Sequence, residues 1–300
     1  MRVLLIYPPP WKIPEQGRQP DETGAGPPPG IDSAALLSGD ILHLPCGLLS
    51  LAAQAQRAGH TVEVVNLFTC AWDRIVEIIK TRPADFFGLS CFTSNRRGTL
   101  YLARLIRELY PQAHIAVGGP HATALPAGML EQCSAIDTVV IGEGEETFAR
   151  LLSGIEKNTV ACGIPGTAYR SQGRILLAPP RPRIDDLDRL APACDCAADH
   201  IIITSRGCPW DCSFCASTCI WGKKVRSFSP KYVLDMLHIL VNGCGQKALA
   251  FKDETFTLDR RRVLAVCRGI MERGLNFLWS CDTRADALDE ELLAAMRRAG

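Results

Sequence analysis

Short apolar runs rich in β-branched residues alternate with longer amphipathic segments along the first half of the chain. Runs of this kind are typical of buried strands, and they predict strands at residues 2–8, 61–67, 85–92, 114–119 and 138–142. The amphipathic segments predict helices at residues 46–58, 71–81, 97–110 and 145–154. Such alternation implies right-handed βαβ units and a parallel sheet covered on both faces. The first half therefore predicts a flavodoxin-like doubly wound α/β domain, with its ligand at the carboxyl ends of the strands.

The pattern changes after residue 155. Residues 156–199 predict a linker that contains a hairpin around Ser171-Gln172-Gly173 and a proline-rich connector. Strand–helix alternation then returns, with strands expected at 200–209, 247–253 and 276–282 and helices at 230–242, 259–273 and 288–299. We therefore expect three segments: a doubly wound domain at 1–155, the linker at 156–199, and the first half of a βα (partial TIM-like) barrel at 200–300.

Composition and charge exclude several classes of function. The chain is 47% apolar and 22% charged with a net charge of +1, which is ordinary for a globular protein and gives no bulk attraction to nucleic acid. The N-terminal apolar run is too short for a signal peptide or a membrane span. We expect a cytoplasmic protein with no nucleic-acid partner and no membrane span. In that compartment the 14 cysteines stay reduced, so clustered cysteines indicate metal ligands.

One cluster stands out, in the stretch TSRGCPWDCSFCAS at 204–217, which follows a predicted strand. Cys208, Cys212 and Cys215 have the spacing C-x3-C-x2-C. Structural zinc sites normally close with four protein ligands, so three cysteines favour a [4Fe–4S] cluster with one iron left open. Cys219 gives an alternative in which four cysteines hold zinc or a fully ligated cluster.

This motif, with an aromatic residue before its last cysteine, resembles that of the radical S-adenosylmethionine superfamily. The resemblance implies that the three cysteines hold the cluster and that S-adenosylmethionine chelates the open iron. Reductive cleavage of that cofactor would then give a 5′-deoxyadenosyl radical. By the same resemblance Phe214 would lie near the adenine, and the strand-end residues Asp253, Glu254 and Arg284 would bind S-adenosylmethionine.

The first domain lacks a dinucleotide fingerprint. Three prolines, Pro8 to Pro10, stand where G-x-G-x-x-G would follow the first strand. Glycines cluster instead in VGGPHATALP (117–126) and VIGEGEETF (140–148), where the backbone can approach a large flat ligand. These segments resemble the cobalamin-binding domain found upstream of radical S-adenosylmethionine domains. The resemblance implies that cobalamin is bound by Ser90, Gly118, Gly119, Pro120, His121, Gly142, Glu143 and Gly144.

The axial-ligand motif Asp-x-His-x-x-Gly of cobalamin proteins is missing. Asp40 and His43 come close in position but not in spacing, so the cobalt is expected to lack a protein imidazole. Two interpretations stay open for the glutamates here: Glu143 and Glu145 line the edge of the pocket, or Glu145 and Glu146 act as favourable charges at the N-terminus of the next helix.

The resemblance as a whole implies a cobalamin-dependent radical S-adenosylmethionine enzyme, most often one that methylates an unactivated carbon of a small-molecule or lipid substrate. An alternative is a cobalamin-binding cyclase, oxidase or rearrangement enzyme without methyl transfer, and another is a non-catalytic corrinoid and iron–sulfur protein. A reductase, flavodoxin or ferredoxin would supply the electron. Because the barrel's fourth-strand motifs would begin past Gly300, we expect a truncated and, by itself, inactive chain. No catalytic residue beyond the cofactor ligands is assigned.

Overall fold

The computed structural model describes residues 1–10, 45–157, 159, 163–193 and 200–300. Asp40 and His43 lie outside these residues. The chain divides into two compact units, Met1–Arg183 and Ile184–Gly300, which are described separately below.

The first unit is built on a parallel sheet. Its strands are β1 (Arg2–Tyr7), β2 (Thr61–Asn66), β3 (Phe86–Ser90), β4 (His114–Gly118) and β5 (Thr138–Val140). They are ordered β2-β1-β3-β4-β5, and all neighbours in this part of the sheet are parallel. This is the flavodoxin-like order, and it confirms the predicted doubly wound α/β class. The order reverses at β1, so the carboxyl ends of β1 and β3 lie on either side of a switch point.

The predicted hairpin forms, but it belongs to this sheet rather than to a connecting segment. Its strands β6 (Thr167–Ser171) and β7 (Arg174–Leu177) pair antiparallel with each other, and β6 pairs antiparallel with β5. The turn residues Gln172 and Gly173 have φ angles of 48° and 74°, as a tight two-residue hairpin requires. Turn chemistry located the hairpin, whereas its docking on β5 depends on long-range pairing that turn chemistry does not encode.

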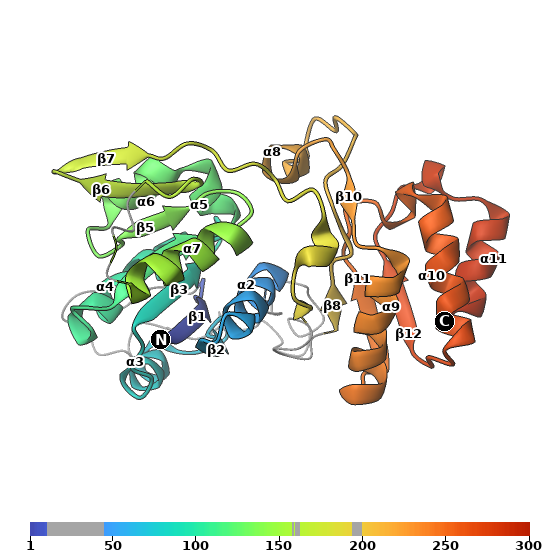
Figure 1. The fold of residues 1–300 in the computed structure, drawn as a ribbon, viewed down its shortest axis with the longest axis horizontal. Helices are drawn as coiled ribbons and strands as arrows, with labels where there is room; N and C mark the ends of the chain where they lie inside the picture. The colour runs from blue at the N-terminus through green and yellow to red at the C-terminus, as the bar shows by residue number, and fades with distance from the viewer. Residues whose placement is uncertain (11–44, 158, 160–162, 194–199) are drawn as a thin grey trace, which may run out of the picture. The chain divides into compact units, whose positions relative to one another are not determined.

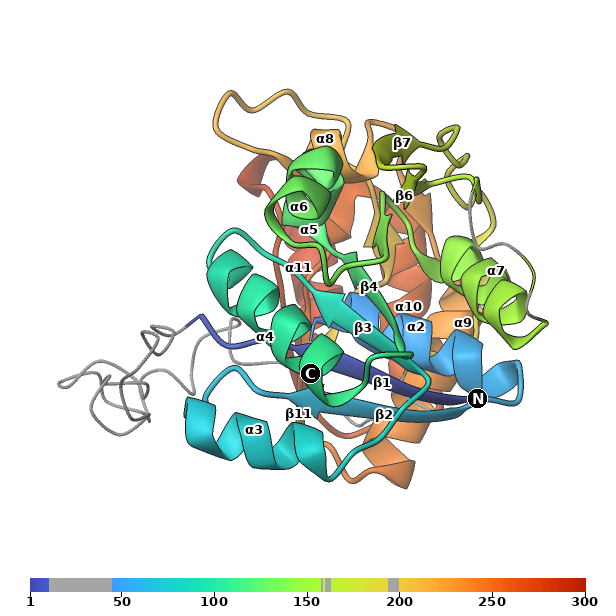
Figure 2. The same cartoon turned by 90° about the vertical axis from the view of Figure 1, so that its left-hand side faces the viewer.

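Helices cover both faces of this sheet (Figures 1 and 2). They are α2 (Cys46–Arg57), α3 (Trp72–Lys80), α4 (Arg96–Leu109), α5 (Pro120–Ala124), α6 (Pro126–Gln132) and α7 (Glu145–Glu156). Adjacent residues of β3 show the two faces, since neighbouring side chains of a strand point in opposite directions. Phe86 meets Phe148 of α7 edge-on at 5.4 Å, and Phe87 stacks on Tyr110 at the end of α4 at 5.3 Å. The sequence did not predict α5 and α6, which are too short to show a helical period.

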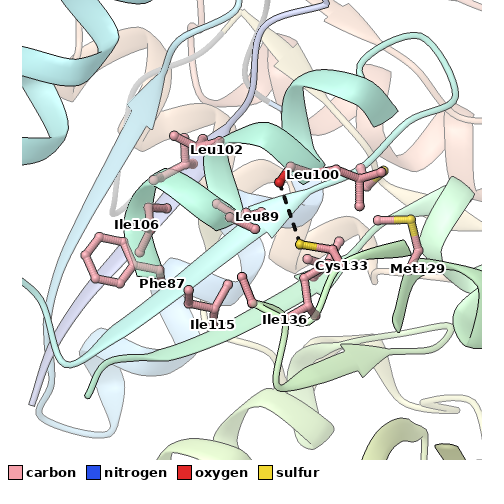
Figure 3. Close-up of a cluster of buried hydrophobic side chains, with 14 of the residues drawn as sticks. Phe87, Leu89, Leu100, Leu102, Ile106, Ile115, Met129, Cys133 and Ile136 are labelled. Carbon is pink, nitrogen blue, oxygen red and sulfur yellow. Dashed lines mark hydrogen bonds between the residues drawn. The ribbon is translucent and has the colours of Figure 1, made fainter. Parts of the chain in front are cut away.

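The core between the sheet and α3, α4 and α6 is shown in part in Figure 3. Phe87, Leu89 and Ile115 from the sheet pack there with Leu102 and Ile106. Cys133 is 1% exposed, and its thiol donates to the carbonyl oxygen of Leu100 at 3.7 Å. It is a small core residue, as expected for cysteines scattered singly through apolar segments.

Acid is expected to destabilise the first unit through His114. Burial lowers the pKa of His114, an effect that the charge of Asp137 opposes. The unfolded chain takes up this proton at its ordinary pKa of about 6.5, so it binds more protons than the folded chain below that pH. Stability is therefore complete above about pH 6.5 and declines as the pH falls towards the lowered folded-state pKa. Urea midpoints at neutral and mildly acidic pH should differ more for the wild type than for His114→Gln; an equal difference would contradict this assignment.

The second unit contains a smaller parallel sheet. Its strands β8 (Ile201–Ile202), β11 (Ala248–Phe251) and β12 (Leu278–Cys281) are ordered β12-β11-β8. The helices α9 (Pro230–His238), α10 (Arg260–Glu272) and α11 (Glu290–Arg298) follow these strands. Each begins where a side-chain oxygen of Ser229, Asp259 or Asp289 accepts from a backbone N–H in the first turn. The sequential strand order is that of the first three units of a βα barrel.

The strand expected at 200–209 is shorter than predicted. After β8 the chain leaves the sheet, and Ser205–Arg206 (β9) pairs antiparallel with Arg226–Ser227 (β10). The strand ends early because the backbone N–H groups of the next residues bind a side chain instead. Oδ1 of Asp253, at the end of β11, accepts from Thr204 at 2.5 Å and from Ser205 at 3.0 Å. A side chain thus takes the place of a neighbouring strand.

Among the residues that the structure describes, none of the helices has the length and apolar character needed to cross a bilayer.

Candidate functional site

The cobalamin-binding residues predicted from sequence gather at one edge of the first unit. They lie at the carboxyl ends of β3 and β4, at the start of α5 and in the loop between β5 and α7. Parallel strands bring these segments to one edge, where ligands bind in doubly wound folds. The set consists of Ser90, Gly118, Gly119, Pro120, His121, Gly142, Glu143 and Gly144.

Gly119 fixes the path of the loop after β4. Its φ is +98°, and a Cβ atom there would lie 2.9 Å from the carbonyl oxygen of Cys91 in the loop after β3. The same carbonyl accepts from the backbone N–H of His121 at 3.1 Å. A side chain at position 119 would push the two loops apart, so glycine is required there for both conformation and space.

His121 faces the same two loops. Its Nδ1 lies 3.0 Å from the hydroxyl of Thr93, and burial lowers the pKa of the imidazole. A neutral ring fixed by Thr93 suits the border of a pocket. Its place beside the corrin remains a prediction.

Sequence reasoning missed Asn95, which ties the edge together. Asn95 is fully buried, and its Nδ2 donates to the carbonyl oxygens of Pro8 after β1 and Ser90 after β3, each at 3.1 Å. Its Oδ1 accepts from the backbone N–H of Phe92 at 2.8 Å. A single side chain therefore joins the loops on either side of the switch point. Only its position after a predicted strand could have drawn attention to it.

In the second unit, the cysteine loop starts from Gly207. Its φ is +102°, and a Cβ atom there would clash with the backbone carbonyl of Lys224. The next residue, Cys208, donates its backbone N–H to the carbonyl oxygen of Gly222 at 3.1 Å. The glycine before the first cysteine thus lets the two ends of the loop approach closely.

Gly207→Ala is expected to lower the amount of iron–sulfur cluster that the chain holds after anaerobic reconstitution, because the loop must move to accept the methyl group. Gly245→Ala is the matched control. Gly245 also has a positive φ, +72°, but among the described residues no heavy atom lies within 4 Å of the point that its Cβ atom would occupy. Backbone strain alone costs about 1–3 kcal/mol in both variants. Equal cluster content in the two variants would show that the close approach to Lys224 is unimportant.

The loop presents its cysteines with graded exposure. Cys208 is buried, Cys212 is partly buried, and Cys215 and Cys219 are exposed. Cys219 lies on the short helix α8 (Ser217–Trp221). Within the described ranges, no three histidine, cysteine or acidic side chains converge as ligands of a single ion. The thiolates of a four-iron cluster each bind a different iron and so need not converge on one point.

Ser217 links the third cysteine to a carboxylate. Its backbone N–H donates to the Cys215 sulfur at 3.5 Å, and its hydroxyl donates to Glu254 Oε1 at 3.0 Å. The other oxygen of Glu254 is buried and, among the described residues, has no hydrogen-bond partner. Burial raises the pKa of Glu254. A buried acceptor without a donor beside the cysteine loop is suited to a ligand that brings an N–H group.

Asp253 and Arg284 have other partners in this structure. Asp253 is 1% exposed, and besides the two backbone N–H groups it accepts from the Thr204 hydroxyl at 2.6 Å. The Arg284 guanidinium donates to Cys212 Sγ at 3.9 Å and lies 4.4 Å from the Trp210 ring centroid. These contacts give Asp253 the role of holding the loop. The predicted binding of S-adenosylmethionine by Asp253 and Arg284 stays a prediction, as does the place of Phe214, which is 91% exposed, near the adenine.

Comparison with known proteins identifies relatives for both units. A family model described as the B12 binding domain matches residues 35–152. An uncharacterized methyltransferase from Pyrococcus horikoshii is 32% identical over 269 residues, which cover 85% of this chain and 58% of the relative. An anaerobic magnesium-protoporphyrin IX monomethyl ester cyclase from Rubrivivax gelatinosus is 28% identical over 277 residues, covering 85% of this chain and 50% of the relative. The chain thus spans about half the length of the curated relatives it matches.

Among solved structures, the fold is similar to that of the radical S-adenosylmethionine methyltransferase TsrM from Kitasatospora setae, in a structure with cobalamin and a [4Fe–4S] cluster bound. The TM-score is 0.74 with 18% sequence identity, and the match covers 100% of this chain and 57% of that one. This likeness shows a shared fold across both units.

Proposed function

Because the chain belongs to the family of radical S-adenosylmethionine proteins that carry a cobalamin-binding domain, we propose that it holds a [4Fe–4S] cluster, S-adenosylmethionine and cobalamin and serves methyl transfer to an unactivated carbon of a small molecule or lipid. The observation that carries this proposal is the joint presence of the three-cysteine loop and, beside it, a buried Glu254 oxygen that no described residue engages. Together these offer soft ligands for iron and an acceptor for an amino group.

The cysteine loop fits a cluster with one open iron. Cys208, Cys212 and Cys215 supply three thiolates, the usual ligands of iron–sulfur clusters. When bound, the cluster supplies the electron that cleaves S-adenosylmethionine, and cobalamin supplies a methyl carrier. The chain holds the loop in place through Gly207 and Asp253, and it sets the surroundings of Cys215 through Ser217.

Glu254 is the residue proposed to accept from the amino group of S-adenosylmethionine. Ser217 orients its carboxyl group through Oε1, which leaves Oε2 to accept from the incoming amino group. A charge-assisted hydrogen bond at Oε2 would favour the carboxylate, whose pKa burial otherwise raises.

Glu254→Gln is therefore expected to weaken the binding of S-adenosylmethionine by about 10- to 100-fold, the loss of one hydrogen bond to a charged group. Equilibrium dialysis against the cluster-loaded chain measures this, and iron content serves as the check on the cluster. Glu272→Gln, at the end of α10, is a control expected to bind normally. Unchanged affinity in Glu254→Gln would remove Glu254 from the site.

In the first unit, cobalamin is proposed to lie over the loops after β3, β4 and β5. Gly119 and Gly142, both with positive φ, keep the backbone free of side chains there. The carboxyl group of Glu145 accepts from the Ser50 hydroxyl at 2.8 Å, so it joins α7 to α2 and leaves Glu143 as the acidic residue proposed at the pocket edge.

Methyl transfer is proposed ahead of cyclisation because the relative that is 32% identical carries the name of an uncharacterized methyltransferase, while the cyclases are 28% identical or less. The experiment uses methyl-labelled S-adenosylmethionine with the cobalamin- and cluster-loaded chain and a flavodoxin or ferredoxin as electron donor. Label recovered in the cobalamin-containing fraction is the expected result. Release of 5′-deoxyadenosine with all label retained in methionine would instead favour cyclisation, oxidation or rearrangement.

A further inference from the structure

We propose that Arg284 is a positioning residue of the cysteine loop and raises the reduction potential of the cluster, rather than binding S-adenosylmethionine. This inference rests on the proposed function, because it concerns the cluster that Cys208, Cys212 and Cys215 would hold. Arg284 follows β12, and the loop follows β8, so the contact joins the two outer strands of the small sheet.

Three contacts engage the Arg284 guanidinium. Nη1 donates to Cys212 Sγ at 3.9 Å, and Cζ lies 4.4 Å from the centroid of the Trp210 ring. Nε and Nη2 donate to the two carboxylate oxygens of Asp286 at 2.9 and 2.8 Å. The bidentate pair with Asp286 fixes the plane of the Arg284 guanidinium. Its remaining nitrogen, Nη1, is thereby turned towards the Cys212 sulfur.

Trp210 gives Arg284 a second contact with the cysteine loop. It stands between Cys208 and Cys212 in the sequence and is only 38% exposed despite its position on a surface loop. A guanidinium over an indole face contributes about 0.5–1 kcal/mol at an exposed site. Arg284 therefore contacts both the middle cysteine and the tryptophan two residues before it.

The charge of Arg284 has a predictable effect on electron transfer. Reduction adds a negative charge to the cluster, and a nearby cation with an N–H···S contact stabilises the more negative state. Hydrogen bonds to sulfur are among the features that set the potentials of iron–sulfur clusters. Asp286 partly neutralises Arg284, so the N–H···S contact and the orientation of the fork matter together with the charge.

The existing contacts also argue against a role in binding S-adenosylmethionine. A guanidinium whose fork already holds Asp286 would have to release that carboxylate to bind another one bidentately. Glu254 has a buried oxygen without a hydrogen-bond partner among the described residues, whereas three of the five N–H groups of Arg284 already donate to Asp286 and Cys212.

The test is a redox titration of the cluster in the reconstituted 300-residue chain. The titration is monitored by electron paramagnetic resonance in the absence of S-adenosylmethionine. Arg284→Ala is expected to lower the midpoint potential by an amount equal to about a tenfold change in the reduction constant, or about 59 mV for one electron. The midpoint potential of Arg284→Lys should lie between those of the wild type and Arg284→Ala, because lysine keeps the positive charge but lacks the planar guanidinium. Arg273→Ala is the matched control, since Arg273 has a similar exposure of 35% and pairs with Asp235 on the surface.

A second measurement, the affinity for S-adenosylmethionine, separates the two roles of Arg284. An unchanged midpoint together with weakened affinity in Arg284→Ala and Arg284→Lys overturns the inference and restores the sequence-based prediction. If Arg284→Ala does not fold, the midpoint of Arg284→Lys decides in the same way. Failure of the wild-type chain to take up iron and sulfide would instead contradict the proposed function itself, a result distinguishable from either of these.

Discussion

Cys208→Ala, Cys212→Ala and Cys215→Ala are each expected to abolish assembly of a [4Fe–4S] cluster, while Cys219→Ala leaves it intact. Each of the three thiolates would bind its own iron, so the loss of one cannot be made up by the other two. Anaerobic reconstitution of the wild type should give about four iron atoms and four sulfides per chain. The three variants should fall to near background.

Cys219→Ala is the control that separates the two ligand sets. Cys219 is exposed like Cys215, but it lies on α8, one turn beyond the loop. Full cluster content and visible absorption in Cys219→Ala supports three cysteines with an open iron. Loss of the cluster in Cys219→Ala would support four cysteine ligands and a cluster without an open position, as in a non-catalytic iron–sulfur protein.

Asp253→Ala is expected to destabilise the second unit by about 3–5 kcal/mol, the cost of breaking a buried charged network by removing one partner. The change leaves the backbone N–H groups of Thr204 and Ser205 without their acceptor. It also removes one of the three negative charges that act on the buried Arg262, leaving those of Asp259 and Asp188. Burial lowers the pKa of Arg262, and the charge of Asp253 is the largest effect that opposes this.

Arg262 extends this network to the segment after the cysteine loop. Its guanidinium donates to the carbonyl oxygens of Thr204 at 2.8 Å and Phe228 at 2.9 Å. It therefore holds the chain both before and after the cysteine loop. Urea unfolding monitored by tryptophan fluorescence measures the loss, because three of the five tryptophans, Trp210, Trp221 and Trp279, lie in this unit.

Asp282→Asn provides the comparison for Asp253→Ala. Asp282 forms an ion pair with Lys252 at 3.3 Å and is 61% exposed, so its loss should cost at most about 1 kcal/mol. If Asp253→Ala is no more destabilising than Asp282→Asn, the carboxylate of Asp253 does not hold the loop.

Local patterns predicted most of the longer helices and strands because each of these carries its own periodic signal. Apolar runs located the parallel strands, and the turn at Gln172-Gly173 located the hairpin. The short elements α5, α6, α8 and β10 were missed because elements of so few residues show no periodic pattern. The pairing of β6 with β5 was missed because it depends on residues that meet only after folding.

The candidate site divides in the same way. The spacing of Cys208, Cys212 and Cys215 can be read directly from the chain, and so can the glycines after β4 and β5. The contacts of Asp253 with Thr204 and of Arg284 with Cys212 join residues 49 and 72 positions apart. Because local sequence does not report such distances, it assigned both residues to S-adenosylmethionine on resemblance alone.

The central claim is that the chain holds a cluster with one iron open to S-adenosylmethionine. Electron paramagnetic resonance of the reduced, reconstituted Cys219→Ala chain, recorded with and without S-adenosylmethionine, tests it most directly. We predict a cluster signal that changes on addition of S-adenosylmethionine and, with the amino nitrogen isotopically labelled, a hyperfine coupling to that nitrogen. A cluster signal that S-adenosylmethionine leaves unchanged would contradict the claim.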